Sequence, residues 1–289
     1  MAGEQSECDR PLVSVVMPVL NGMPWVDMQL EAVSAQELPC DWEVVVADNG
    51  SDDGTRSCVE RWAQRDARVH WVDASARPGA GGARNIGVEF AGGQKLAFCD
   101  ADDIVRPGWL AAIVAGLSDA DLVAGVFDFG SLHGQPQSVP IPAATRQMGF
   151  LPFALGANMA VSREAFEAVH GFREDIPPSE DTDLSWRLQL AGYRFAVAAD
   201  ALVAKREQAD GMPTFRGAWA YGRCAPLLYR HYRPTGMKRD YRGAVKAWVW
   251  LLVASPGLVR PARRHQWVRS FGIRAGRLTG SFTYHAFFP

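Results

Sequence analysis

Lys95-Leu96-Ala97-Phe98-Cys99-Asp100-Ala101-Asp102-Asp103 is the most informative segment of this 289-residue sequence. Residues 95–99 are mostly apolar and predict a short buried β-strand, which ends directly on three carboxylates. In an open α/β sheet, ligands bind where the strands end. Carboxylates this close repel one another unless a cation lies between them, and an all-oxygen ligand set suits Mg²⁺ or Mn²⁺. The segment therefore predicts a divalent metal that bridges to phosphate groups.

The same acidic residues have a plainer explanation. The alternative is a loop that caps the next helix, with Asp103 near the helix start and Pro107 in its first turn. Because D-x-D is a short pattern, both interpretations stay open at this point.

Predicted strands and helices alternate along the first third of the chain, with strands at 12–17, 43–47, 69–72 and 95–99 and helices at 24–36, 55–65 and 82–90. Such alternation indicates βαβ units and an α/β fold, with a mostly parallel sheet flanked by helices. Pro18, Asp48 and Asp100 then lie at one edge of that sheet. Further on, the pattern predicts strands at 121–129 and 157–162, a helix at 179–191, and a helical region beyond residue 205.

A basic C-terminal region follows an acidic body. Residues 1–204 hold 14 basic and 29 acidic residues, whereas residues 205–289 hold 16 and 3, although the whole chain has a net charge of only -2. This asymmetry predicts two functional regions. The hydrophobic content of 48% and charged content of 21% are typical of a soluble globular protein.

The cysteine pattern indicates a reducing compartment. The count is odd and lacks the spacing of a metal site, the five residues being Cys8, Cys40, Cys58, Cys99 and Cys224. Residues 1–10 are polar and lack the apolar core of a signal peptide. We therefore expect a cytoplasmic protein, with the inner face of a membrane as the alternative location.

Five segments resemble motifs of the family 2 glycosyltransferases, which have the GT-A fold. They occur in the family's order and together cover residues 12–204, the segments being 13–21, 48–55, 82–87, 98–103 and 180–184. The resemblance implies inverting transfer of a sugar from a nucleotide sugar, with a UDP-sugar as the expected donor. It also implies a GT-A domain at 12–204, with a nucleotide half at about 12–106 and an acceptor half at about 107–204. A polar tail at 1–11 precedes this domain, and a basic, amphipathic helical region at 205–289 follows it.

On the donor side, the resemblance implies that Pro18, Val19 and Asn21 line the nucleotide pocket. Asp48 would accept a hydrogen bond from the base, commonly uracil, whose N3–H is a donor. The alternative for Asp48 is an Asx-turn that starts the following loop.

The resemblance also implies contacts with the rest of the donor. Arg84 and its helix start would lie near the diphosphate, the alternative being a solvent-facing arginine in a glycine-rich loop. Asp100, followed by Ala101, would lie near the ribose. Asp102 would bind the metal that bridges the diphosphate and offsets its charge.

On the acceptor side, the resemblance makes Asp181 the general base, which takes the proton of the attacking hydroxyl. Glu180 and Asp183 would position the acceptor or support the helix, and Asp183 could instead pair with Arg187 at i,i+4. The alternative is that these acids simply favour a helix start after Ser179. Asn158 would lie in a strand beneath the donor sugar, with an ordinary buried strand as its alternative.

One position departs from the family pattern. Many relatives carry a histidine shortly after the last strand of the domain, where this chain has Lys205 and Arg206. Lys205 is then a candidate to contact the diphosphate directly as a cation.

The apolar run at 247–254 is only eight residues long, and spanning a membrane needs about 20. Tryptophans and arginines around it suit a membrane interface, which would fit a peripheral enzyme with a lipid-linked acceptor. The alternative is a helical hairpin packed on the catalytic domain, which would fit a soluble small-molecule or peptide acceptor. A glycan acceptor is also open.

Two other functions are alternatives to sugar transfer. A sugar-phosphate nucleotidyltransferase would carry a glycine-rich loop ending in arginine and lysine after the first strand, but residues 18–24 contain one glycine and no basic residue. A non-catalytic nucleotide-sugar-binding domain would bind the donor without turnover. A nucleic-acid partner is not expected, because no binding motif accompanies the basic region.

Overall fold

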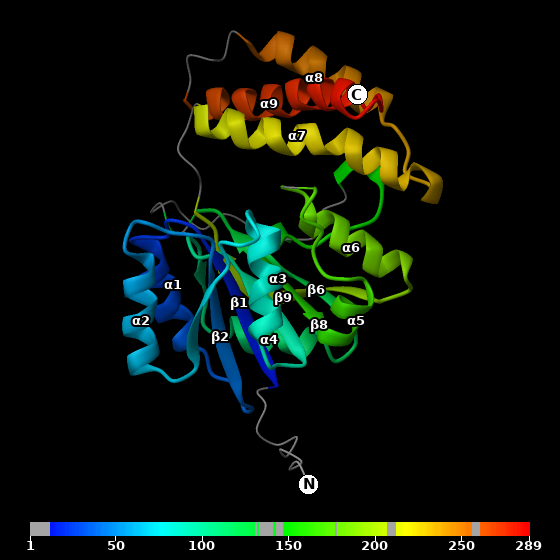
Figure 1. The fold of residues 1–289 in the computed structure, drawn as a ribbon. Helices are drawn as coiled ribbons and strands as arrows, with labels where there is room; N and C mark the ends of the chain where they lie inside the picture. The colour runs from blue at the N-terminus through cyan, green and yellow to red at the C-terminus, as the bar shows by residue number, and fades with distance from the viewer. Residues whose placement is uncertain are drawn as a thin grey trace. The chain divides into compact units, whose positions relative to one another are not determined.

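The computed structural model describes residues 12–130, 132, 141–142, 147–176, 178–206, 212–255 and 261–289. It divides into two compact units (Figure 1). The first unit contains residues 1–145, 153–174 and 184–206, and the second contains 146–152, 175–183 and 207–289. Each unit is described by itself below.

The first unit is built on a nine-stranded sheet in the order β3-β2-β1-β4-β8-β6-β9-β5, with β7 paired to β6. Its strands are β1 (Val13–Val19), β2 (Trp42–Asp48), β3 (Val69–Asp73), β4 (Lys95–Cys99), β5 (Ile104–Val105), β6 (Leu122–Asp128), β7 (Ile141–Pro142), β8 (Asn158–Ser162) and β9 (Phe195–Ala204). Strands β3, β2, β1 and β4 are parallel, and β8 then enters antiparallel between β4 and β6. The α/β fold class is confirmed, with the parallel part concentrated in its first half.

Helices cover the sheet (Figure 1): α1 (Trp25–Ser34), α2 (Thr55–Arg65), α3 (Ala80–Phe90), α4 (Trp109–Gly116), α5 (Arg163–Ala168) and the later part of α6 (Glu180–Leu190). Strands β2 and β6 are buried at every position. Continuous burial is expected where helices cover both faces of a sheet, because no residue then faces water.

The expected helix cap at Asp103 is wrong. The next helix, α4, begins at Trp109 after Gly108, whose φ of 81° suits glycine. Residues 104–105 instead form β5, which pairs with β9. Arg106 precedes Pro107, and a residue before proline is disfavoured in helical conformation, so the chain stays extended past the acidic residues.

Asn158 is a completely buried hydrogen-bond centre. Its Nδ2 donates to the carbonyls of Val126 (2.9 Å) and Ala201 (3.0 Å), and its Oδ1 accepts from Trp109 Nε1 (2.9 Å). A Cβ on Gly125 would lie 2.2 Å from Asn158 Oδ1, so glycine is needed there. The side chain thus ties β8 to β6, β9 and α4, and this geometry favours the buried-strand interpretation over contact with a donor sugar.

The second unit contains α7 (Met212–Tyr232), α8 (Tyr241–Ala254) and α9 (Pro261–Thr283). Glycines bring the backbones of α7 and α9 together: a Cβ on Gly276 would lie 2.1 Å from the Trp219 carbonyl oxygen, and one on Gly280 would lie 2.2 Å from that of Arg223. Trp267 of α9 donates to the Leu251 carbonyl of α8 at 2.8 Å. Among the described residues, none of the helices has the length and apolarity needed to cross a membrane.

Asn158→Ala tests this hydrogen-bond centre. The change leaves the Trp109 indole N–H and two carbonyls without their partner, each at a cost of about 1–3 kcal/mol. We expect the free energy of unfolding, measured in urea, to fall by about 3 kcal/mol or more. The control Gln64→Ala, on the exposed side of α2, should change it by about 0.5 kcal/mol or less. Equal losses in the two variants would show that Asn158 is not a structural centre.

Candidate active site

The ends of β1, β2 and β4 lie at one edge of the sheet, as predicted. Val19 is opposite Asp48 in the parallel register, and Phe98 of β4 is opposite Val16 of β1. Gln29 of α1 holds the turn after β4: its completely buried amide donates to the Asp100 carbonyl and accepts from the Val105 N–H, both at 3.0 Å. The backbone of the acidic segment is therefore fixed on both sides of Asp102.

Asp48 ends β2 and is 3% exposed. Its Oδ1 accepts from the backbone N–H of Gly50 (3.2 Å) and Ser51 (2.9 Å), so the Asx-type turn is present. Its Oδ2 accepts from Trp71 Nε1 at 3.2 Å. A carboxylate oxygen has two lone pairs, and Oδ2 can therefore accept one further hydrogen bond.

Asn21 joins the loops that follow β1 and β2. Its backbone N–H donates to Ser51 Oγ (2.8 Å), and its Oδ1 accepts from the Asp52 N–H (2.9 Å). Asn21 has a φ of 52°, a conformation that asparagine tolerates better than most residues. Pro18 is half-buried, whereas Val19 is buried, so of the three predicted pocket residues Asn21 is the exposed one.

The three carboxylates after β4 form one cluster. Asp100, Asp102 and Asp103 each place an oxygen within 4.8 Å of the others. Lys205 lies between two of them, with its Nζ at 3.1 Å from Asp100 Oδ2 and 2.7 Å from Asp103 Oδ2. The contact of Lys205 with a diphosphate stays a prediction, and in this structure its ammonium pairs with Asp100 and Asp103.

Arg84 supplies a second positive charge. Its Nη2 is 2.8 Å from Asp100 Oδ1, and the residue is only 4% exposed, so the solvent-facing alternative is wrong. It lies in the second turn of α3, which begins after Gly79 at a φ of 96°. Arg84 therefore reaches the acidic motif from the helix expected to lie near the diphosphate.

Burial and charge act against each other in this cluster. Burial disfavours ionisation of Asp100, yet the charges of Lys205 and Arg84 hold the pKa of its carboxyl below the usual value. Burial raises the pKa of Asp103 to about 7 against the opposing effect of Lys205, and burial also raises the pKa of Asp102. Burial alone would lower the pKa of the Lys205 ammonium. The negative charges of Asp100 and Asp103 outweigh this effect and raise the pKa, so the ammonium stays protonated.

A divalent cation fits Asp102 better than its two neighbours. Asp103 is completely buried, and Asp103 and Asp100 already face Lys205. Asp102 is exposed and makes no ion pair among the residues that the structure describes. Its carboxylate is the hard oxygen ligand that Mg²⁺ and Mn²⁺ prefer. The donor set therefore suits a metal held by Asp102 together with ligand oxygens.

Gln29 and Arg206 were given no role from the sequence, and Asp103 was expected only as one of the three carboxylates or as a helix cap. The Arg206 backbone N–H donates to Asp103 Oδ1 (2.9 Å), and its Nε donates to the Asp102 carbonyl (2.9 Å). Its guanidinium lies 3.6 Å from the ring centroid of Trp25. The only signal for this arrangement was the lysine–arginine pair found where relatives carry a histidine.

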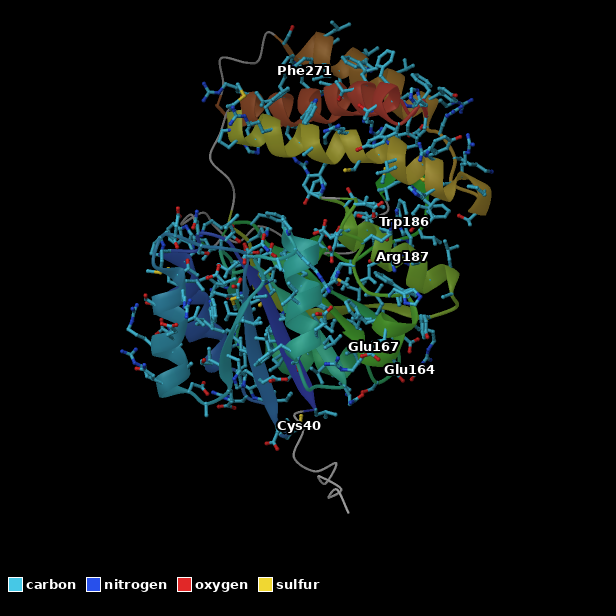
Figure 2. The ribbon with its side chains drawn as sticks, in the orientation of Figure 1. Cys40, Glu164, Glu167, Trp186, Arg187 and Phe271 are labelled. Carbon is cyan, nitrogen blue, oxygen red and sulfur yellow. The ribbon has the colours of Figure 1, made fainter. Side chains whose placement is uncertain are left out.

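The predicted acceptor-side acids lie at the start of α6, in the second unit. Asp181 is 6% exposed, and its Oδ1 accepts from the Thr182 N–H at 2.6 Å. Asp183 is completely buried and accepts from the Tyr232 hydroxyl at 2.6 Å. Arg187, which lies later in α6 and is labelled in Figure 2, belongs to the first unit. It donates to the carbonyls of Val169 and Gly171 of that same unit. Asp183 is thus held by α7, and Asp181 is the less enclosed of the two.

Two family models match the chain. The family model described as glycosyl transferase family 2 matches residues 14–169, more than half of the chain. The chain belongs to glycosyl transferase family 2. A second model, glycosyl transferase family group 2, matches residues 141–284.

A curated relative is the glycosyltransferase AglE of Haloferax volcanii, which is 29% identical over 200 residues. The match spans 66% of this chain and 66% of that relative, just under two thirds of its length.

Two solved structures share the fold. The mannosyltransferase PcManGT of Pyrobaculum calidifontis, in complex with GDP-Man and Mn²⁺, has a TM-score of 0.66 and 20% identity, covering 95% of this chain and 88% of that one. S. aureus TarS 1-349 in complex with UDP-GlcNAc has a TM-score of 0.53 and 19% identity, covering 96% and 93%. The expected GT-A fold with a helical C-terminal region is therefore confirmed.

Lys205→Met tests the electrostatic role of the lysine. Removing the ammonium leaves the buried Asp103 beside Asp100 without its cation, and such unpaired charges cost about 3–5 kcal/mol. The pKa of Asp103 is already about 7, above its unfolded value, so the folded state is favoured by protonation at low pH and loses that advantage as the pH rises through 7. Without Lys205 this pKa rises further.

We therefore expect the stability loss of Lys205→Met, measured by chemical unfolding in EDTA, to be larger at about pH 8 than at about pH 5. Arg65→Met, on the exposed end of α2, is the control and should show a small loss at both values. A loss for Lys205→Met that is independent of pH would contradict the assigned ion pairs.

Proposed function

We propose that this family 2 glycosyltransferase moves a sugar from a nucleotide-sugar donor to an acceptor hydroxyl, with inversion at the anomeric carbon. The observation that carries the proposal is the acidic cluster at the carboxyl end of β4, held by Arg84 and Lys205 while Asp102 stays exposed. This arrangement offers a cation site and nearby positive charge where a diphosphate would lie. Family membership favours sugar transfer over the nucleotidyltransferase alternative.

The donor is proposed to be a UDP-sugar, with Asp48 accepting a hydrogen bond from the base. The free lone pair of Asp48 Oδ2 suits an N–H donor such as uracil N3–H. A guanine edge also presents N–H donors, and one structural neighbour binds GDP-Man while another binds UDP-GlcNAc. Uracil and guanine present a ring N–H to the carboxylate, whereas the ring N3 of cytosine is an acceptor and cytosine could donate only through its exocyclic amine.

Asp102 is proposed to hold Mg²⁺ or Mn²⁺. When bound, such an ion acts as a Lewis acid that offsets the charge developing on the departing nucleoside diphosphate. Asp100 and Asp103 remain with Lys205 and keep the turn in place. Arg84 adds a fixed positive charge behind Asp100.

Asp181 is proposed to be the general base. In a single displacement, the acceptor oxygen attacks the anomeric carbon while Asp181 takes its proton and the nucleoside diphosphate leaves from the opposite face. Asp183 is less suited to this role, because it is completely buried and accepts a hydrogen bond from Tyr232. Its contact supports the start of α6 instead.

Asp181→Asn separates catalysis from helix capping. The amide keeps the size of the side chain but cannot take a proton, and loss of a general base typically slows turnover by about 10²–10⁴-fold. We expect donor affinity and the melting temperature to stay near those of the wild type, while transfer to an identified acceptor falls by that factor. Glu180→Gln, at the neighbouring buried position, is the matched control and should lose much less activity.

Two outcomes would contradict this assignment. If Asp181→Asn keeps most of its activity, the base lies elsewhere. If the wild-type protein binds UDP-sugars but neither transfers nor hydrolyses them across a panel of donors and acceptors, the non-catalytic alternative is favoured.

A further inference from the structure

Helix α8 carries apolar side chains on a face that is exposed to solvent. Val245, Val249, Leu252 and Val253 are 53–75% exposed, whereas Ala244 and Leu251 are buried at 5% and 3%. The spacing of i, i+4, i+7 and i+8 places the four exposed residues on one side of the helix. Of the described helices, α9 is the main neighbour of α8, and it receives the opposite side. We call Val245, Val249, Leu252 and Val253 the apolar face of α8.

Strong positive charge surrounds this apolar face. Residues 211–289 contain 14 lysines and arginines but a single acidic residue, Asp240. Asp240 is already used as the N-cap of α8, where it accepts from the Gly243 N–H at 2.8 Å. Arg242 and Lys246 are exposed next to the apolar face, and Arg264 and Arg269 are exposed on α9. A partner that is both apolar and negatively charged would therefore complement this surface.

A groove runs between α8 and α9, and Arg274 is one of the residues that line it. It has a volume of about 320 Å³ and is lined by Ala247, Trp250, Gln266, Ser270, Ile273 and Arg274. Arg274 Nη1 is buried and makes no hydrogen bond to any residue that the structure describes. Burial lowers the pKa of this guanidinium, and the more distant Asp240 only partly offsets the effect. An arginine beside an aromatic wall is a favourable site for a phosphate group.

We propose that the apolar face of α8 docks on an anionic lipid bilayer, with a lipid phosphate held at Arg274 in the α8–α9 groove. Because α8 has 14 residues, it would lie in the plane of the interface rather than cross it. Its valines and leucine would enter the boundary between headgroups and acyl chains, and the flanking basic residues would face the phosphates. Trp250 at the groove suits this depth, where aromatic rings concentrate.

The proposal can be tested by co-sedimentation of the full chain with vesicles. One set contains phosphatidylcholine alone, and the other contains phosphatidylcholine with phosphatidylglycerol. We expect binding to the anionic vesicles only, weakened by added salt. The double variant Leu252→Ser/Val253→Ser should bind about tenfold more weakly or worse, because two exposed apolar side chains are lost. The matched control Phe90→Ser, which removes an apolar side chain that is 53% exposed on α3, should bind like the wild type.

A second pair of variants tests the groove. Arg274→Gln should weaken binding to anionic vesicles, whereas Arg65→Gln, on α2, should not. All variants alter exposed or groove positions, and an unchanged melting temperature confirms that they fold. Full-length protein that ignores anionic vesicles at low salt would overturn the proposal. So would a protein that dimerises through this face in light scattering, with the α8 variants abolishing the dimer and leaving vesicle binding unchanged.

Discussion

The ammonium group of Lys205 lies between Asp100 and Asp103 and forms ion pairs with both. The sheet edge where β1, β2 and β4 end depends on these ion pairs. Asp103 is completely buried, and a buried carboxylate beside two others is unstable without a cation. Lys205 follows β9, 105 residues after Asp100, so a motif that is local in sequence is completed by a distant strand. Any change that displaces β9 is therefore expected to disturb the acidic site as well, even if it touches none of the aspartates.

The carboxylates of residues 100–103 are in two different environments. Asp100 and Asp103 are held by protein cations and keep the turn rigid, together with Gln29 beneath it. Asp102 is left at the surface with its backbone carbonyl bound by Arg206. Preorganisation of this kind favours binding, since the backbone that carries the carboxylate does not have to be ordered when the ligand arrives. The positive charges of Arg84 and Lys205 also lower the repulsion that a diphosphate would meet near three carboxylates.

Much of this architecture could be predicted from the sequence, because apolar runs that end in polar turns identify parallel strands well. Strands β1, β2 and β4 and the edge they share follow from that pattern. Strand β9 was missed because it mixes exposed and buried residues along its length. The hydrogen bonds of Asn158 could not be predicted, because a strand pattern does not reveal which distant groups a buried amide satisfies. Arg84 was expected near a diphosphate, but only coordinates could show that Asp100 is its partner, and Lys205 was noticed only through a missing histidine.

The proposed metal position, at Asp102 alone, differs from a cluster in which all three aspartates surround the ion. Anomalous diffraction at the manganese edge, from crystals of the protein grown with Mn²⁺ and UDP, locates the ion directly. We expect one manganese peak bound by Asp102 and phosphate oxygens, with Lys205 still between Asp100 and Asp103. A peak between Asp100 and Asp103, with the Lys205 side chain displaced, would show that the lysine only occupies the metal's place and would contradict the central claim.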